Sequence, residues 1–127
     1  MRLLVTGGAG FIGSNYVRWV LANTDDEVVV YDALTYAGNL STLKDVDDSP
    51  RYSFVQGNIC DPGPLEDAMR GCDAVVHFAA ESHVDRSIEG SDDFVITNCF
   101  GTNVVMDTAR RVGVGRVVHI EIGRAHV

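Results

Sequence analysis

Glycines at positions 7, 8, 10 and 13 have the spacing of a phosphate-binding turn. They satisfy G-x-G-x-x-G from Gly8 and G-x-x-G-x-x-G from Gly7. A strand that turns sharply into a helix needs one glycine for its backbone conformation, a second where a pyrophosphate approaches the main chain, and a third where the helix packs on the sheet. The N–H groups and the dipole at the start of that helix attract phosphate oxygens. The pattern predicts a dinucleotide site.

A carboxylate at the end of the next apolar run supports the same interpretation. Asp32 follows the run at residues 28–31. In that position a carboxylate accepts hydrogen bonds from the ribose hydroxyls of adenosine and repels a 2′-phosphate, which favours NAD over NADP. The alternative is an ordinary tight turn followed by a solvated strand end.

A second group of polar residues follows the apolar run at residues 74–78. Residues 77–88 read HFAAESHVDRSI. The two small alanines would let the main chain pass close to a cofactor, and Ser82 and His83 carry donors for a nicotinamide and a bound sugar. Loops at this edge of a sheet often carry function. A polar loop that solvates the strand end, with Asp85 and Arg86 as a local ion pair, explains the same residues.

Strand and helix patterns alternate along the chain, which is typical of a parallel sheet with helices on both faces. We expect strands at 2–6, 28–31, 52–56, 74–78 and 116–120, and helices at 11–22, 40–43, 62–71 and 92–112. Asp61 is the expected N-cap of the third helix, and Trp19 is expected on the apolar face of the first. Right-handed crossovers then give a doubly wound α/β Rossmann sheet of order 3-2-1-4-5. Both the glycine turn and the segment after Phe78 fall where that strand order reverses.

Composition limits the classes of partner. The 127 residues carry a net charge of −8 with no basic cluster, which argues against nucleic-acid and membrane partners. Cys60, Cys72 and Cys99 are widely spaced and odd in number, which indicates a reducing compartment and small buried side chains rather than a metal site. No stretch reaches the length of a membrane span. We expect a soluble, cytoplasmic protein without a metal.

Three motifs resemble a known family. Residues 6–14, TGGAGFIGS, resemble the extended short-chain dehydrogenase/reductase superfamily, and residues 32–39, DALTYAGN, with 79–87, AAESHVDRS, resemble its dTDP-glucose 4,6-dehydratases. The resemblance runs to about Ile120. It implies NAD as cofactor, dTDP-glucose as substrate and a homodimer. The implied reaction moves a hydride from C4 of the glucose unit to NAD⁺, loses water across C5 and C6, and returns the hydride to C6.

The glycine pattern and the resemblance together assign cofactor contacts to Gly7, Gly10, Phe11, Ile12, Gly13, Asp32, Ala33, Leu34, Thr35, Gly38, Asn58, Ile59, Phe78, Ala79, Ala80, Glu81, Ser82 and Thr97. By the resemblance, residues 11–12 contact the pyrophosphate and residues 32–35 hold the adenosine ribose. Residues 58–59 flank the adenine, and residues 78–82 pass the nicotinamide. Ser82 and His83 are expected to reach the substrate. Asn58 replaces a usual Asp, and Ala33 replaces a common Lys, so we expect a modest effect on NAD affinity.

The family's catalytic residues follow the fifth strand, as a Ser/Thr-Asp-Glu run and then a Tyr-x-x-x-Lys pair. We expect them beyond Ile120, because no tyrosine here has Lys four residues on. Residues 121–127, EIGRAHV, match the translated read-through of a sequencing adapter. We therefore expect an incomplete, truncated NAD-binding domain at 1–120, inactive alone, and a non-native tail in which Glu121 is not catalytic. The alternatives are a stand-alone NAD-binding module and a fragment of a nucleotide-sugar 4-epimerase, the latter disfavoured by residues 81–86.

Overall fold

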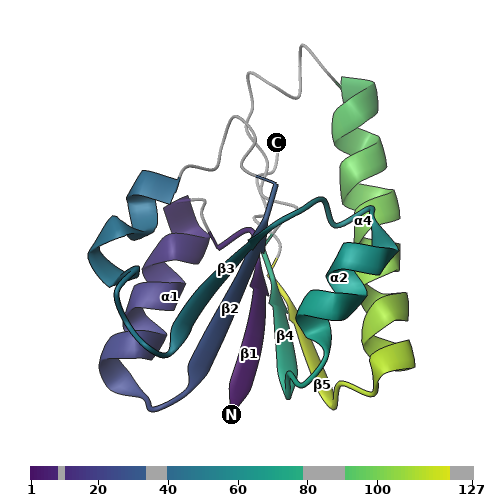
Figure 1. Cartoon of the computed structure of the whole chain (residues 1–127). Helices are drawn as coiled ribbons and strands as arrows, with labels where there is room; N and C mark the ends of the chain where they lie inside the picture. The colour runs from purple at the N-terminus through teal and green to yellow at the C-terminus, as the bar shows by residue number, and fades with distance from the viewer. Residues whose placement is uncertain (9–10, 34–39, 79–90, 121–127) are drawn as a thin grey trace.

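The central feature is a parallel sheet of five strands (Figure 1). A computed structural model describes residues 1–8, 11–33, 40–78 and 91–120. The strands are β1 (Arg2–Thr6), β2 (Glu27–Asp32), β3 (Tyr52–Gln56), β4 (Ala74–His77) and β5 (Arg116–His119). Their order is β3-β2-β1-β4-β5, so the predicted Rossmann topology is confirmed.

Helices cover the two faces of this sheet. Helix α1 (Phe11–Asn23) and the 3₁₀ helix η1 (Leu40–Val46) lie on one side in Figure 1, and α2 (Pro62–Met69) and α4 (Ser91–Val112) lie on the other. All four residues of β4 are buried, as expected for a parallel strand covered on both faces. An ion pair ties α2 to α4 at the surface, where Glu66 of α2 accepts from Arg111 of α4 at 2.8 Å.

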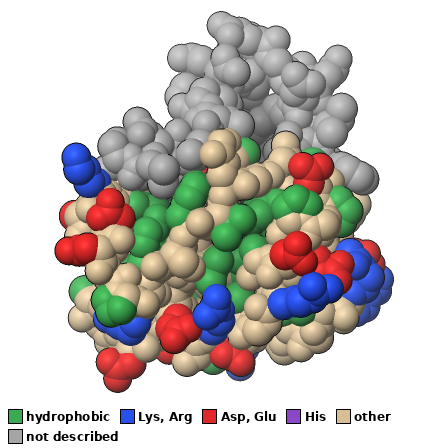
Figure 2. All heavy atoms as spheres, viewed as in Figure 1, with side chains coloured by type: hydrophobic (Ala, Val, Ile, Leu, Met, Phe, Trp, Pro, Cys, Tyr) green, Lys and Arg blue, Asp and Glu red, His purple; other side chains and the backbone are tan. Residues whose placement is uncertain are grey.

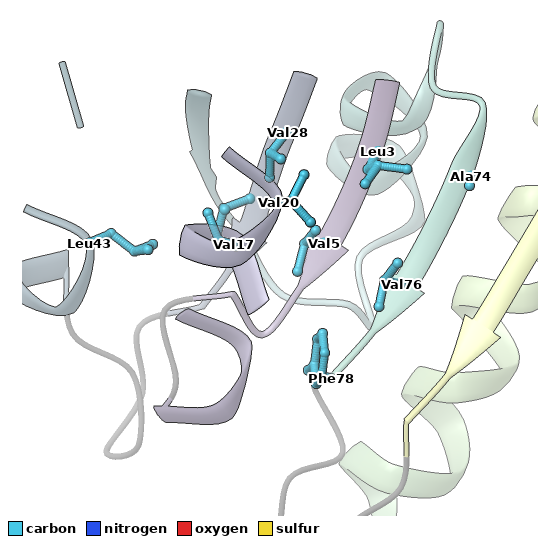
Figure 3. Close-up of a cluster of buried hydrophobic side chains, with 10 residues drawn as sticks. Leu3, Val5, Val17, Val20, Val28, Leu43, Ala74, Val76 and Phe78 are labelled. Carbon is cyan, nitrogen blue, oxygen red and sulfur yellow. The ribbon is translucent and has the colours of Figure 1, made fainter. Parts of the chain in front are cut away.

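Successive residues of the strands point to opposite faces and form two cores. Leu3 and Val5 contribute to the core under α1, whereas Leu4 contributes to the core under α2 and α4. Figure 3 shows the first core, in which Val17 and Val20 of α1 lie over β1 and β2. On the face drawn in Figure 2, acidic and basic side chains lie next to one another around a hydrophobic middle.

The structure corrects two expectations about helices. Trp19 is 58% exposed, so its predicted place on the buried face of α1 is wrong. The large apolar side chains of α1 that are buried are those of Val17 and Val20, because its apolar residues are spread too widely around the helix for all of them to face the sheet. Asp61 does occupy the N-cap position of α2, but its side chain makes no capping hydrogen bond.

Element boundaries differ from the prediction by a few residues at the ends. Strand β4 ends at His77 rather than residue 78, β5 ends at His119, and α2 ends at Met69 rather than near Gly71. The short helix predicted at 40–43 extends to Val46 and is of the 3₁₀ type. These shifts leave the order and pairing of the strands unchanged. Residues 121–127, predicted to be a non-native tail, lie outside the described residues.

Candidate functional site

The turn between β1 and α1 shows why glycine is required at its ends. Gly7 has a φ of 73°, and its N–H donates to the Tyr31 carbonyl at 3.0 Å. A Cβ on Gly13 would overlap the Gly7 carbonyl oxygen, so the first turn of α1 packs directly on the loop. Gly8 is also confined, because its Cβ would lie 2.8 Å from Val30 Cγ1. Gly10, expected at the pyrophosphate, lies outside the described residues.

Helix α1 begins directly after this turn, at the carboxyl end of β1. It starts at Phe11, and its first turn contains no acidic residue. Its first N–H groups therefore form a positively polarised helix end without a competing carboxylate. Ile12 lies in that turn and is 38% exposed, so it is accessible to a ligand. This arrangement fits the anion-binding role predicted from the glycines.

Asp32 lies beside the glycine turn. It is the last residue of β2 and directly follows Tyr31, whose carbonyl accepts the hydrogen bond from Gly7. The Asp32 carbonyl in turn accepts from the Gly57 N–H at 3.1 Å, which ties the end of β2 to the end of β3. The predicted phosphate site and the carboxylate predicted to bind the ribose are thus neighbours at one edge of the sheet. Ala33 is partly buried, and the predicted Leu34, Thr35 and Gly38 lie outside the described residues.

The loop after β3 places Asn58 at the surface and Ile59 in the core. The Asn58 side-chain oxygen accepts from the Cys60 N–H at 2.8 Å, and its carbonyl accepts from the Tyr31 hydroxyl at 2.9 Å. Burial, with a smaller effect of Asp61, raises the pKa of Tyr31 to about 12, so the phenol remains a donor. Ile59 is 5% exposed. Its predicted contact with adenine would have to come mainly from its main chain.

The segment after β4 begins with a buried aromatic ring. Phe78 is 5% exposed, and its ring lies 5.5 Å from that of Tyr16, between centroids. Figure 3 shows Phe78 at the end of β4, within the core under α1. Its N–H donates to the Thr6 carbonyl at 2.8 Å, which joins the ends of β4 and β1. The predicted Ala79, Ala80, Glu81, Ser82 and His83 lie outside the described residues, and Thr97 belongs to α4.

Two polar contacts of His77 at this edge were not predicted from the sequence. His77 Nδ1 lies 2.6 Å from Thr6 Oγ1, and His77 Nε2 lies 3.2 Å from Thr102 Oγ1. Both Thr6 and His77 are buried. No local pattern signals the contact with Thr6, since Thr6 and His77 are far apart in the sequence.

Within the described ranges, no group of His, Cys, Asp and Glu side chains could hold a metal ion. Cys60 is partly buried and Cys72 is buried, both as free thiols. Burial raises the pKa of each thiol, so they are small core or near-core side chains and not activated nucleophiles. None of the helices in the described part of the chain combines the length and apolar content of a membrane span.

Comparison with known proteins identifies the family. The family model for GDP-mannose 4,6 dehydratase matches residues 4–122. A dTDP-glucose 4,6-dehydratase of Streptomyces niveus is 51% identical, with 94% of this chain matching 37% of that protein.

Solved structures agree with this assignment. A double mutant of DesIV, a dTDP-glucose 4,6-dehydratase from Streptomyces venezuelae crystallised with NAD, is 58% identical with a TM-score of 0.89, over 94% of this chain and 38% of that one. A UDP-glucose 4-epimerase from Thermotoga maritima is 30% identical with a TM-score of 0.81, over 94% and 37%. The resemblance to the dehydratases is therefore confirmed, and the chain spans less than two-fifths of the length of these relatives. The chain belongs to the GDP-mannose 4,6 dehydratase family.

Proposed function

We propose that residues 1–120 form the NAD-binding part of a nucleotide-sugar 4,6-dehydratase that acts on dTDP-glucose. The observation that carries this proposal is the hydrogen bond between Gly7 and Tyr31, which sets Asp32 beside the glycine turn. Dinucleotides bind in the crevice at the carboxyl ends of the strands where a doubly wound sheet changes direction. Here that point lies between β1 and β4.

The residues present fit the cofactor. The turn at residues 7–13 and the start of α1 would bind the pyrophosphate, and Asp32 would accept hydrogen bonds from the adenosine ribose. Asn58 stands at the end of the next strand, where the adenine would lie. When bound, NAD supplies the acceptor and donor for the transient hydride transfer. This chain's own residues bind and orient it, and the segment 79–83 would lie along the nicotinamide and the sugar.

Two other functions have less support. A nucleotide-sugar 4-epimerase shares the fold, but the epimerase structure from Thermotoga maritima is 30% identical whereas the dehydratase structure is 58% identical. A stand-alone NAD-binding module would need the same site and no catalytic residues. We further propose a cytoplasmic, homodimeric parent protein. The free thiols of Cys60 and Cys72 support a reducing compartment.

Substitution of Asp32 tests the proposed site. We expect Asp32→Ala to raise the Kd for NAD, measured by calorimetry, by at least about tenfold, because hydrogen bonds to a charged group contribute roughly 1.5–3 kcal/mol. The preference for NAD over NADP should also fall, since the repulsion of a 2′-phosphate is lost.

The matched control is Asp25→Ala, which removes an exposed carboxylate from the loop between α1 and β2, at the opposite edge of the sheet. It changes the net charge equally and should leave both affinities unaltered. Equal affinities of the Asp32→Ala protein and the unmodified chain would contradict the ribose assignment. An unmodified chain that binds no NAD would overturn the proposed function.

A further inference from the structure

Three hydrogen-bonded side chains lie at the carboxyl ends of β1 and β4, where the strand order reverses. Thr6 Oγ1 is 2.6 Å from His77 Nδ1, and His77 Nε2 is 3.2 Å from Thr102 Oγ1. Thr6 is 0% exposed and His77 is 1% exposed. The three residues belong to β1, β4 and α4, so a single imidazole connects three elements.

We assign a direction to these hydrogen bonds. The Phe78 N–H, which donates to the Thr6 carbonyl at 2.8 Å, also donates to Thr6 Oγ1 at 3.2 Å, and we therefore take the Thr6 hydroxyl as the donor to His77 Nδ1. Nδ1 is then the acceptor, and the proton on Nε2 is donated to Thr102. Burial, followed by the nearby His119, lowers the pKa of His77 to about 4, so the ring is neutral at pH 7.

Each of these three residues is close in the sequence to a segment of the proposed cofactor site. Thr6 directly precedes Gly7, and His77 is followed by Phe78 and the residues expected along the nicotinamide. Thr102 lies about a turn and a half beyond Thr97 in α4. A shift of any one element would therefore move a different segment of the proposed cofactor site.

We propose that His77 is a positioning residue, which holds the ends of β1, β4 and α4 in the arrangement that binds the pyrophosphate and nicotinamide half of NAD. This inference rests on the proposed function. The adenosine half would be held by Asp32 and the end of β3, which take no part in the chain of hydrogen bonds. The affinities for the two halves of the ligand should consequently respond differently when one of these hydrogen bonds is removed.

Thr102→Val removes the hydrogen bond between His77 Nε2 and residue 102 while keeping the shape of the side chain. We expect this variant to raise the Kd for NAD about tenfold, as expected for loss of one partly buried hydrogen bond, and to change the Kd for adenosine less than about twofold. Thr102→Ser restores the hydroxyl and should restore the affinity for NAD. Thr108→Val is the matched control, because Thr108 is a buried threonine of the same helix whose hydroxyl accepts from Arg111 and is remote from His77.

A long-range ¹H–¹⁵N spectrum of the histidine rings reports the tautomer independently of ligand binding, with His77→Gln used to assign the signal. We expect a protonated Nε2 and an unprotonated Nδ1. The opposite tautomer would contradict the donor and acceptor roles assigned to these hydrogen bonds.

The binding outcomes separate the two proposals. If the unmodified chain binds NAD and Thr102→Val weakens the binding of NAD and adenosine equally, or of neither, the positioning role is wrong while the proposed function stands. If the unmodified chain binds adenosine but not NAD, both are wrong.

Discussion

At the scale of single residues, the candidate site depends on main-chain groups more than on side chains. Gly7 and Gly13 act through the absence of a Cβ, while the side chains of Ile59 and Phe78 lie in the two cores. Asp32 is the described side chain to which the proposed function assigns a specific contact with the ligand. Chemical selectivity at the adenosine end should therefore depend strongly on that one carboxylate.

The buried imidazole of His77 makes stability depend on pH. Its pKa is about 4 in the folded chain, against 6.5 for an ordinary histidine. Above pH 6.5 neither state binds the proton. As pH falls from 6.5 to 4 the unfolded chain becomes protonated first, so the free energy of unfolding should fall by up to about 3 kcal/mol. Urea titrations at a series of pH values would measure this slope.

The control for this prediction is His77→Gln, which removes the titrating group. Its free energy of unfolding should be lower at pH 7 but should vary less with pH over the same interval. Parallel curves for the two proteins would show that His77 does not account for the dependence.

At the scale of elements, the sequence predicted much of the arrangement and missed what is non-local. Runs of valine and leucine located β1, β2 and β4, because parallel strands buried on both faces have continuous apolar runs. The outer strands β3 and β5 contain no buried residue, and their shorter apolar segments between turn residues located them. The exposure of Trp19 was missed because an apolar stretch does not show which side of a helix will face the sheet. The contact of Thr6 with His77 was missed because it depends on the pairing of β1 with β4.

Arg51 joins the end of α1 to the start of β3. Its guanidinium donates to the carbonyls of Leu21 at 2.7 Å, Thr24 at 2.8 Å and Asp26 at 3.0 Å. The Leu21 carbonyl belongs to the last turn of α1 and the other two follow the helix, so the guanidinium lies at the negative end of the helix dipole, where a cation is favoured. We expect Arg51→Ala to lower the free energy of unfolding by about 2 kcal/mol in urea titrations.

Arg18→Ala provides the comparison for Arg51. Arg18 pairs with the exposed carboxylate of Asp45 at 2.9 Å, and an exposed ion pair contributes roughly 0–1 kcal/mol. If both substitutions have the same small effect, the contacts of Arg51 do not stabilise the junction.

At the scale of the whole molecule, the described tyrosines are unsuited to act as a catalytic base. Burial raises the pKa values of Tyr16, Tyr31 and Tyr52, whereas a tyrosine that accepts a proton near neutral pH needs a lowered pKa. The resemblance places the catalytic tyrosine after the fifth strand. The described tyrosines are thus poor candidates for that base, which is consistent with the proposed role of this chain in binding and orienting the cofactor.

A chimera tests this division of roles. Residues 1–120 would replace the matching part of the Streptomyces niveus dehydratase, which is 51% identical in this region. We expect the chimera to convert dTDP-glucose to the 4-keto-6-deoxy sugar, detected by mass spectrometry, and the 127-residue chain with NAD⁺ to convert none. Conversion by the chain alone would contradict the assignment of catalysis to other residues. A folded chimera that only epimerises a nucleotide sugar would favour the alternative function.

The position of β1 in the middle of the sheet has a consequence during synthesis. Its carboxyl end meets β2 soon after both are made, but Thr6 and its partner His77 are 71 residues apart. At roughly 5–20 residues per second, β4 follows on the order of 4 to 14 seconds later. During that interval one edge of β1 presents unpaired N–H and C=O groups, which can pair with other strands. The speed of translation therefore sets how long the main-chain groups of β1 are exposed to pairing with strands of other molecules.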